Sequence, residues 1–546
     1  MTDLRLFKTG LIRLGTWRRR VPWPLKWSSL VLWGLAALVA AALLLPPAYL
    51  VVRAVSAGGA AWQGLLRPRT LEVVVRSLWL AGAVTGLSAA IAVPLAWLTV
   101  RTDLPLRRVW AALTPLPLVI PSYVGAYLIA SALGPRGLLQ QALEGPLGLT
   151  RLPEIYGFPG ALITLTLLSY PYLLLSVRAA LARLDPALEE AAHSLGYDAW
   201  TTFWRVTLPL LRPALGAGGL LVALYTLRDF AAVALMRYDT FTRVIYVQYR
   251  SFDRSQAALL ALVLVALTLV FLALEARTQS RARYYQSGAG AARPPTLVRL
   301  GFWRWPAFLF CAGVVFLSLG LPAGVLAYWL IRGLRAGEVI TALGPATWNS
   351  VLASGLAAAV TVAAALPVAI LAVRRPGPLT RRLERLTYSA FALPGIVIAL
   401  ALVFFGANHA PWLYQSLPML ILAYGILFIP QAVGALRSAL LQIHPSLEEA
   451  ARTLGRRPAQ VFLAITLPLL RPGLVAGASL VFLTAMKELP ATLILAPIGF
   501  KTLATSVWSA VSEAFFAQAA APALLIVLMS SLPMTFFMLR EQRVDG

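Results

Sequence analysis

Long apolar runs alternate with short polar segments along the whole chain. Each run approaches the roughly 20 residues that a helix needs to cross a bilayer, and the runs fall into two sets of about six. The predicted spans are 28–52, 78–100, 109–133, 160–182, 214–236 and 256–276, followed by 306–331, 351–373, 387–408, 414–436, 474–497 and 518–539. The pattern predicts an all-α polytopic membrane protein of about 12 transmembrane helices, arranged as two pseudo-symmetric six-helix halves.

Basic residues collect in alternate loops, and by the positive-inside rule this sets the orientation. The N-terminal segment before Trp27 is strongly basic, and the uncharged run from Trp27 to Val52 is too long for the core of a signal peptide. Both termini are therefore expected in the cytoplasm. One loop fits this orientation poorly, because the predicted outer segment 237–254 holds four arginines against two aspartates: Arg237, Arg243, Arg250 and Arg254 against Asp239 and Asp253.

Composition agrees with the membrane assignment and excludes other classes. Hydrophobic residues make up 59% of the chain, charged residues only 12%, and the mean hydropathy is +0.77, which is too apolar for a water-soluble domain. The net charge of +26 reflects arginines in alternate loops and does not indicate nucleic-acid binding. The single cysteine, Cys311, excludes an internal disulfide and a cysteine-based metal cluster.

One hydrophilic segment occurs twice, 259 residues apart, as from Glu189 to Glu448. The repeat predicts a first half of residues 1–277 with a loop at 185–213, a linker at 278–304, and a second half of residues 305–546 with a loop at 444–472. Four positions outside the loops repeat with a separation of 273 residues: Ser77, Pro94, Arg101 and Pro121 match Ser350, Pro367, Arg374 and Pro394. The two separations differ because the first half has an insertion, which we place at 134–159.

Local signals predict the shape of the repeated loop. Asp185 before Pro186 indicates an N-cap and a first helical residue, and Gly196 indicates the end of a short helix. A second helical stretch is expected from about Ala199, and Pro209 and Pro213 are expected to break it at the membrane.

The short helix should present a small apolar face made by Leu188, Ala192 and Leu195, beside an acidic start. Such a face suits a shallow groove with a basic rim on a partner protein. The alternative is an amphipathic helix that lies on lipid headgroups, but adjacent glutamates fit an anionic leaflet poorly.

Both loops resemble the EAA motif of ATP-binding-cassette importer permeases. The matching residues are Glu190, Ala191, Ala192, Gly196, Leu208 and Pro209, and then Glu449, Ala450, Ala451, Gly455, Leu467 and Pro468. In that family the loop forms a coupling helix that sits in a cleft of a separate ATPase. The resemblance implies a type I importer permease in a bacterial plasma (inner) membrane, with ATPase-coupling residues Glu189, Glu190, Ala191, Ala192, Gly196, Glu448, Glu449, Ala450, Ala451 and Gly455.

The chain does not contain its own ATPase, since it has no Gly-x-x-x-x-Gly-Lys-Ser/Thr loop. We therefore expect no catalytic residues, no metal ligands and no cofactor on this chain; ATP and magnesium would be bound by the partner. The resemblance implies two copies of a cytoplasmic ATPase and one extracytoplasmic binding protein, besides membrane lipid.

Each predicted fifth span contains a base followed by an acid, Arg228-Asp229 and Lys487-Glu488. Charge in a span is costly and by default indicates function. One hypothesis is that Asp229 and Glu488 contribute to a constriction on the translocation path of a cationic substrate. The other is that base and acid neutralise each other, or hold backbone where Pro490 disturbs the helix.

The segments 229–254 and 487–508 resemble the ferric-iron branch of these permeases, so the preferred substrate is ferric iron. Thiamine or another small solute is the alternative within the family. Outside it, a secondary transporter of the major-facilitator type also has twelve spans, although it would need protonatable residues in the spans and gives no reason for the twin loops. A membrane-bound enzyme would need a catalytic cluster in a loop, and the sequence offers none.

Overall fold

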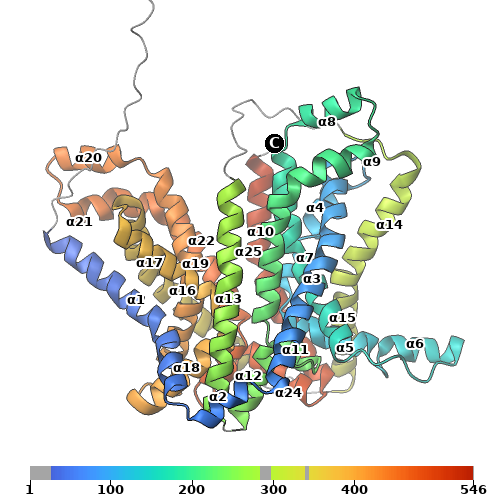
Figure 1. Ribbon diagram of the computed structural model, residues 1–546, viewed down its shortest axis with the longest axis horizontal. Coiled ribbons are helices and arrows are strands. Elements are labelled where there is room, and N and C mark those ends of the chain that lie inside the picture. The colour runs from blue at the N-terminus through green and yellow to red at the C-terminus, as the bar shows by residue number, and fades with distance from the viewer. Residues whose placement is uncertain (1–25, 252, 283–296, 338–342, 545–546) are drawn as a thin grey trace, which may run out of the picture.

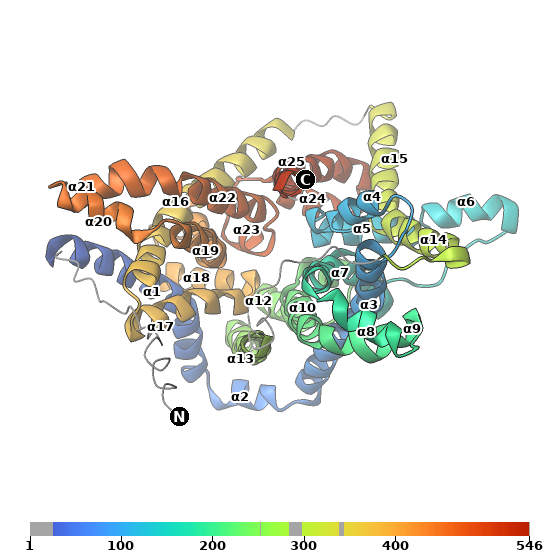
Figure 2. The ribbon, with the colours of Figure 1, turned by 90° about the horizontal axis from the view of Figure 1, so that it is seen from above.

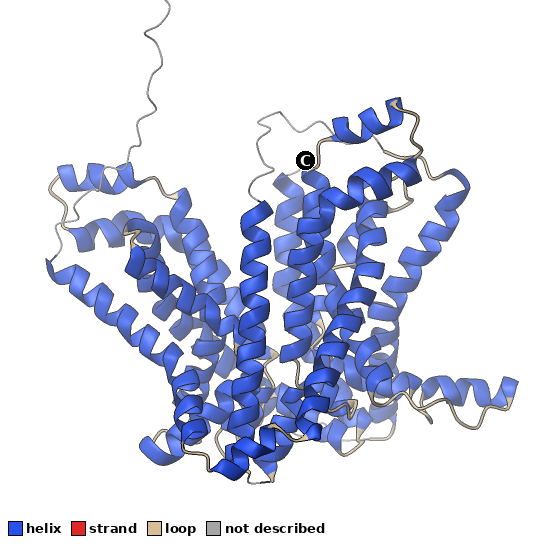
Figure 3. Cartoon of the chain, in the orientation of Figure 1, coloured by secondary structure: helices blue, strands red, loops and turns tan. Residues whose placement is uncertain are grey.

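The apolar runs of the sequence form long helices, and the only β-type pairing in the described residues is one bridge between Thr102 and Val298 (Figure 3). The structure is a computed structural model that describes residues 26–251, 253–282, 297–337 and 343–544. The predicted basic N-terminal segment lies outside these residues, as does 283–296 of the predicted linker.

In the described part of the first half the chain forms thirteen α-helices, and the helical content follows the predicted spans. They are α1 (Lys26–Val55), α2 (Gly59–Leu65), α3 (Pro68–Arg101), α4 (Arg107–Leu113), α5 (Ser122–Leu133), α6 (Leu138–Leu147), α7 (Phe158–Arg183), α8 (Pro186–Ser194), α9 (Ala199–Thr202), α10 (Leu208–Arg228), α11 (Ala231–Leu235), α12 (Phe241–Arg250) and α13 (Arg254–Ala282). Two short turns, η1 (Leu116–Val119) and η2 (Phe203–Thr207), join neighbouring helices.

Within the described residues, the second half repeats this order without counterparts of α2 and α6, and α14 and α15 together take the place of α1. Its helices are α14 (Arg304–Val315), α15 (Leu321–Arg335), α16 (Leu343–Arg374), α17 (Pro378–Ser389), α18 (Gly395–His409), α19 (Leu417–Gln442), α20 (Pro445–Thr453), α21 (Pro458–Val461), α22 (Leu467–Met486), α23 (Pro490–Leu495), α24 (Leu503–Ser512) and α25 (Phe516–Val544). The shorter turns are η4 (Gly301–Trp303), η5 (Phe316–Gly320), η6 (Ala390–Ala392) and η7 (Phe462–Thr466).

The predicted class, an all-α polytopic membrane protein, is confirmed. Among the described residues, 9 helices are long and apolar enough to cross a membrane, and up to 11 spans result if each of two bent helix pairs counts as one. Helix α25 covers the remaining predicted range, 518–539, and its first part, Phe516–Ser531, is apolar.

Two predicted spans are sharply bent. The chain turns by 100° between Val119 and Ser122, and by 104° between Ala392 and Gly395. The residue before a proline is pushed into the extended region, and here Ile120 and Leu393 have ψ values of 120° and 114°. The prediction of one continuous span over 109–133 and over 387–408 is therefore corrected to two short helices with a proline-induced bend.

The expected break at Pro209 and Pro213 is wrong. Residues Ala199–Arg228 form one continuous helical stretch. It passes through the π-helical turn η2 directly before Leu208 and Pro209, and η7 occupies the same place before Leu467 in the second half. A widened turn accommodates a residue that has no N–H to donate, so the helix continues through the proline.

The helices form two groups that meet at the end carrying α12 and α24 and diverge toward the end carrying α8 and α20 (Figure 1). The first helix of each half packs on the other half. Helix α1 contacts α16, α17 and α18, whereas α14 and α15 contact α3, α4 and α5 (Figure 2). We call this packing of each first helix on the opposite half the exchange, and it joins the two groups along their membrane spans.

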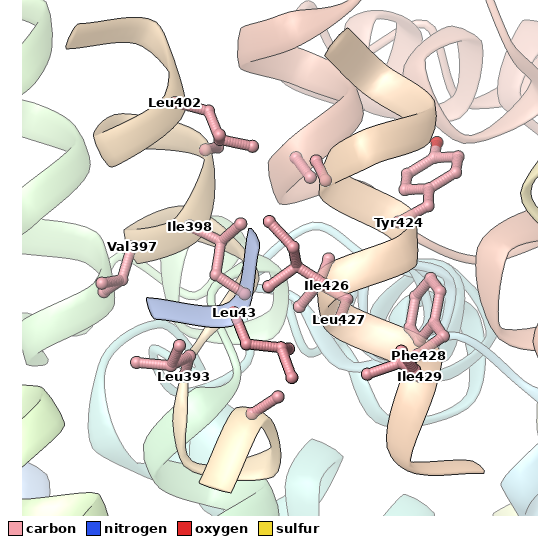
Figure 4. Packing of buried hydrophobic residues seen from close by; sticks show 14 of the residues in the cluster. Leu43, Leu393, Val397, Ile398, Leu402, Tyr424, Ile426, Leu427, Phe428 and Ile429 are labelled. Carbon is pink, nitrogen blue, oxygen red and sulfur yellow. The ribbon is translucent and has the colours of Figure 1, made fainter. Parts of the chain in front are cut away.

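The packing of α1 shows how the exchange is held. Leu43 of α1 is 4% exposed and lies beside Leu393 and Ile398 of the second half (Figure 4). Nearby, Thr268 of α13 donates a hydrogen bond to the carbonyl of Ala392 (2.6 Å), which satisfies a buried acceptor at the proline bend. Side-chain packing and one buried polar contact therefore connect residues far apart in the sequence.

We predict that Leu43→Ala lowers the free energy of unfolding by about 2 kcal/mol or more, because it leaves a cavity between the two halves. The neighbouring Leu44 is 49% exposed, so Leu44→Ala is the matched control. Thermal unfolding of both variants in detergent measures the difference. Equal shifts in the two variants would mean that α1 does not pack on the second half in the membrane-extracted protein.

Candidate functional site

The two repeated loops form equivalent helices, α8 and α20, at the same end of the molecule (Figure 1). Asp185 accepts a hydrogen bond from the N–H of Ala187 (3.0 Å), and His444 accepts one from the N–H of Ser446 (3.3 Å). Both helices end before a glycine with positive φ, Gly196 at 86° and Gly455 at 79°. The predicted start and end of the short helix are confirmed, since only glycine adopts this conformation without strain.

The first glutamate of each loop points into the protein. Glu448 accepts hydrogen bonds from Arg374 (2.9 Å) and from the hydroxyl of Thr466 (3.1 Å). In the first loop, Glu189 accepts from the hydroxyl of Thr207 (2.8 Å), and its carboxylate lies 3.6 Å from the guanidinium of Arg101. Each glutamate therefore joins the loop helix both to the end of a span and to the start of the helix that follows the loop.

The arginines of these pairs complete the connection. Arg101 also donates to the carbonyls of Leu181 (3.2 Å) and Leu184 (3.1 Å) at the end of α7, and Arg374 donates to the carbonyl of Ile443 (3.1 Å) after α19. Their side chains are only 2% and 8% exposed. A buried guanidinium needs a paired charge and hydrogen-bond acceptors. The loop glutamate supplies the charge and the backbone carbonyls accept from the terminal nitrogens, while the Nε atoms of Arg101 and Arg374 have no hydrogen-bond partner among the described residues.

The second glutamate and the first alanine of each motif face outward. Glu190, Ala191, Glu449 and Ala450 are exposed, whereas the second alanines, Ala192 and Ala451, are buried at 4% and 7% exposure. The ten predicted coupling residues therefore divide into an inner and an outer set.

The outward apolar face differs from the prediction in one residue. Leu188 and Leu195 are exposed, as are their equivalents Leu447 and Leu454, but Ala192 is buried. Ala192 lies three residues after Glu189 and shares its inward direction, so Ala191 takes the place between the two leucines. The two loops present the same pattern of exposed leucine, alanine and glutamate.

The sequence reasoning did not assign roles to Arg101, Arg374, Thr207 and Thr466. The signal for the arginines was present, because Arg101 and Arg374 repeat at the separation that also relates the prolines of the spans. A basic residue repeated at the end of an equivalent span indicates a conserved geometry within the chain, here a buried pair with the loop.

The charged dipeptides lie where the fifth span of each half is interrupted. Helix α10 ends at Arg228 and α11 begins at Ala231, and α22 ends at Met486 before α23 begins at Pro490. Asp229 accepts a hydrogen bond from the N–H of Ala232 (2.9 Å), and Glu488 accepts one from the N–H of Ala491 (3.2 Å). Both acids therefore act as caps of the short helices that follow the interruption.

Each of the two acids has a neighbour whose size complements its own: the shorter acid lies beside a serine and the longer acid beside a glycine. The side chain of Ser122 lies beside the carboxylate of Asp229, whereas the equivalent position in the second half is Gly395. A Cβ atom on Gly395 would lie 2.5 Å from a carboxylate oxygen of Glu488. The longer acid thus occupies the space that the serine side chain fills in the first half.

Contacts at these interruptions also cross between the halves. Lys487 donates a hydrogen bond to the carbonyl of Leu118 in the first half (3.2 Å), and Arg228 interacts electrostatically with Glu488. Tyr123 is buried within electrostatic range of Glu488 and Tyr424. Polar groups of both halves therefore meet where the two groups of helices converge. The role of Asp229 and Glu488 in a substrate path stays a prediction.

Comparisons with known proteins give two kinds of result. The model of the family described as binding-protein-dependent transport system inner membrane component matches the chain twice, over residues 82–284 and 362–545. The chain is 37% identical over 513 residues to the Fe(3+)-transport system permease protein FbpB 2 of Haemophilus influenzae, covering 93% of this chain and 97% of that protein. It is 26% identical over 487 residues to the ferric transport system permease protein FbpB of Actinobacillus pleuropneumoniae, covering 85% and 71%.

More distant relatives resemble only part of the chain. The sulfate transport system permease protein CysT of Escherichia coli is 28% identical over 249 residues, which cover 44% of this chain and 87% of that protein.

We predict that Glu448→Ala lowers the free energy of unfolding by about 3 kcal/mol, because it leaves the guanidinium of Arg374 buried without its carboxylate. Glu449→Ala is the matched control: it removes an exposed acid from the same helix and should change stability by less than about 0.5 kcal/mol. Thermal or denaturant unfolding in detergent compares the two. A loss of similar size in both variants would contradict the division into inner and outer glutamates.

Proposed function

The chain belongs to the family of binding-protein-dependent transport system inner membrane components, and from this membership we propose that it is the permease subunit of an ATP-driven importer of ferric iron. Residues 1–277 and 305–546 form the two halves, and both termini lie in the cytoplasm. The permease itself catalyses no reaction; a separate ATPase binds ATP and magnesium, and an extracytoplasmic binding protein delivers the substrate.

The observation that carries the proposal is the pair of equivalent helices α8 and α20. Each presents an exposed glutamate between exposed apolar residues, Glu190 with Leu188 and Leu195 in the first loop. A surface presented twice fits a partner present in two copies. Each loop would enter a cleft on one copy of the ATPase.

The inward-facing glutamates explain how a motion of the ATPase would reach the spans. A force on α8 passes through Glu189 to Arg101 at the end of α3 and to Thr207 before α10. The same path in the second half runs through Glu448 to Arg374 and Thr466. Because each loop is tied to two spans, closing the ATPase pair would move each group of helices largely as one body.

The path for the substrate would open where the two groups converge. Lys487 and the carbonyl of Leu118 are joined across the halves, and this contact must break when the groups separate. The interrupted fifth spans place Asp229 and Glu488 beside the same region, and interrupted helices in membrane transporters are found where the backbone lines a cavity.

The names of the relatives support ferric iron as the substrate, since the two ferric permeases cover 93% and 85% of this chain. Fe(III) prefers oxygen ligands. In the part of the chain that the structure describes, no group of three or more His, Cys, Asp or Glu side chains could hold a metal ion. We therefore assign selection to the binding protein and passage to weak oxygen contacts along the path. Thiamine or another small solute is the alternative cargo.

We predict that Glu190→Ala with Glu449→Ala abolishes association with the ATPase and substrate-stimulated ATP hydrolysis. The measurement uses the purified chain in lipid vesicles with its ATPase and a ferric-binding protein, and it records ATP hydrolysis and uptake of radioactive iron, with labelled thiamine as the alternative cargo. Glu513→Ala, an exposed acid at the α12–α24 end, is the control.

Unchanged association and hydrolysis in the double variant would mean that the twin loops are not the docking site. The alternative of a secondary transporter of the major-facilitator type would then have to be considered again. Uptake of thiamine without uptake of iron would retain the ATP-driven permease and change its substrate.

A second prediction concerns the interrupted spans. Gly395→Ser should reduce uptake at least about tenfold, because the new side chain displaces the carboxylate of Glu488 and costs more than about 1.4 kcal/mol. Adding Glu488→Asp should restore most of the uptake, since the pair then reproduces Ser122 with Asp229. Absence of rescue at normal expression would show that the two positions are not coupled by size.

The double variant Asp229→Asn with Glu488→Gln tests the charges themselves. Unchanged uptake in this variant would mean that neither charge takes part in the substrate path.

A further inference from the structure

The hydroxyl group of Tyr123 is buried without a hydrogen-bond partner in the described part of the chain. Four other tyrosines are buried there, and each has a partner: Tyr127 donates to the carbonyl of Phe516 (2.9 Å), Tyr170 to that of Thr114 (2.7 Å) and Tyr238 to that of Arg76 (3.4 Å), and Tyr424 shares a hydrogen bond with the hydroxyl of Thr492 (2.5 Å). A buried tyrosine normally pairs its hydroxyl, because an unpaired one costs free energy. Tyr123 is therefore the exception that needs an explanation.

Packing alone does not account for a tyrosine at this position. The ring of Tyr123 belongs to a cluster of buried residues from both halves, together with Phe230, Leu489 and Val507. The equivalent residue, two positions after the repeated proline of the second half, is Ile396, which is 1% exposed and has no polar atom in its side chain. An apolar side chain fills the corresponding place there, so the hydroxyl of Tyr123 is an addition that the fold does not use.

Oxygen atoms of the second half lie around this hydroxyl. Tyr123 is within electrostatic range of Glu488 and Tyr424. Glu488 accepts a hydrogen bond from the N–H of Ala491 with one carboxylate oxygen (3.2 Å), and Tyr424 is bonded to Thr492. Tyr123 therefore brings a hydroxyl of the first half to carboxylate and hydroxyl oxygens of the second, across the boundary between the halves.

Two basic residues balance the acids in this arrangement. Arg228 of the first half acts electrostatically on Glu488, and Lys487 donates a hydrogen bond to the carbonyl of Leu118 (3.2 Å). Together with Asp229, these half-buried side chains amount to two bases and two acids. The cluster therefore has no formal net charge and would not retain a free cation while the halves are in contact.

We propose that Tyr123 and Glu488 are opposite contacts for the cargo, a cation surrounded by oxygen atoms, when the two halves separate. This inference rests on the proposed function and names residues for the oxygen contacts along its path. The hydroxyl would donate to oxygen atoms of the cargo or accept from its bound water, and the carboxylate would attract its charge.

The position of Arg228 gives the contact a direction. Arg228 and Tyr123 both belong to the first half, so separation of the halves takes the guanidinium away from Glu488 and leaves the carboxylate free for the cargo. When the halves meet again, Arg228 returns to Glu488 and displaces the cargo. A cation that belongs to the protein thus takes the place of the cation that it carries.

The test is Tyr123→Phe, which removes one oxygen atom and keeps the ring. Since that oxygen has no partner in the described residues, the thermal midpoint of unfolding should not fall. Uptake of radioactive iron per ATP hydrolysed should fall about fivefold, which corresponds to the loss of one hydrogen bond of about 1 kcal/mol. The measurement uses the full chain with its ATPase and a ferric-binding protein in lipid vesicles.

Tyr170→Phe is the matched control, because it removes the same atom from a buried tyrosine of the same half. The hydroxyl of Tyr170 is bonded to the carbonyl of Thr114, so this variant should lower the thermal midpoint. It should leave the ratio of iron to ATP within about twofold of the unaltered transporter. The two variants are therefore expected to show opposite patterns of stability and uptake.

A third comparison asks whether the two residues contact the same cargo. Glu488→Gln should also lower the ratio of iron to ATP, because the carboxylate no longer attracts the cation. Tyr123→Phe combined with Glu488→Gln should lose less than the product of the two single losses, since contacts to one bound species are not independent. Single losses that simply multiply would overturn the shared contact.

Unchanged uptake in Tyr123→Phe beside an active unaltered transporter would overturn the inference. A loss of uptake accompanied by a lower thermal midpoint would also overturn it, because the hydroxyl would then have a structural role. If the unaltered transporter itself takes up no iron, the proposed function fails and the inference falls with it, and this result is seen without any variant.

Discussion

Two ion pairs, each with a buried arginine, hold the working parts of the molecule together. Arg101 with Glu189 and Arg374 with Glu448 join each exposed loop helix to a span and to the carbonyls that end the preceding span. A buried charge without its partner is strongly destabilising, so neither loop can move away from its spans without a large cost. The loop therefore behaves as a rigid extension of the helices, and this rigidity is the condition for transmitting a partner's motion across the bilayer.

The duplication extends to single hydrogen bonds, and the departures from it are informative. Serines at equivalent places cap α12 and α24, and acids at equivalent places cap α11 and α23. Where one half differs, the neighbour compensates, as with the serine beside Asp229 and the glycine beside Glu488.

Spans and loop limits could be predicted from the sequence because they depend on local signals. Apolar length set the spans, and Asp185 and Gly196 set the ends of α8. The bends at Pro121 and Pro394 were not predicted, since a proline within an apolar run can either kink a helix or start a new one. The inward direction of Glu189 and Ala192 was not predicted. Glu189 and Glu190 are the same residue type, and which of them points inward depends on Arg101, which is distant in the sequence.

The exchange of α1 was also beyond local signals, and it has a consequence for biosynthesis. Leu43 packs beside Leu393, so α1 leaves the ribosome roughly 20 to 70 s before its partner at ordinary rates of synthesis. Its most apolar window has a mean hydropathy of 2.3 and is only 22% buried in the finished fold, so it can wait in lipid as a stable single helix. The final architecture is thus completed late, when the second half of the chain arrives beside a helix already waiting in the bilayer.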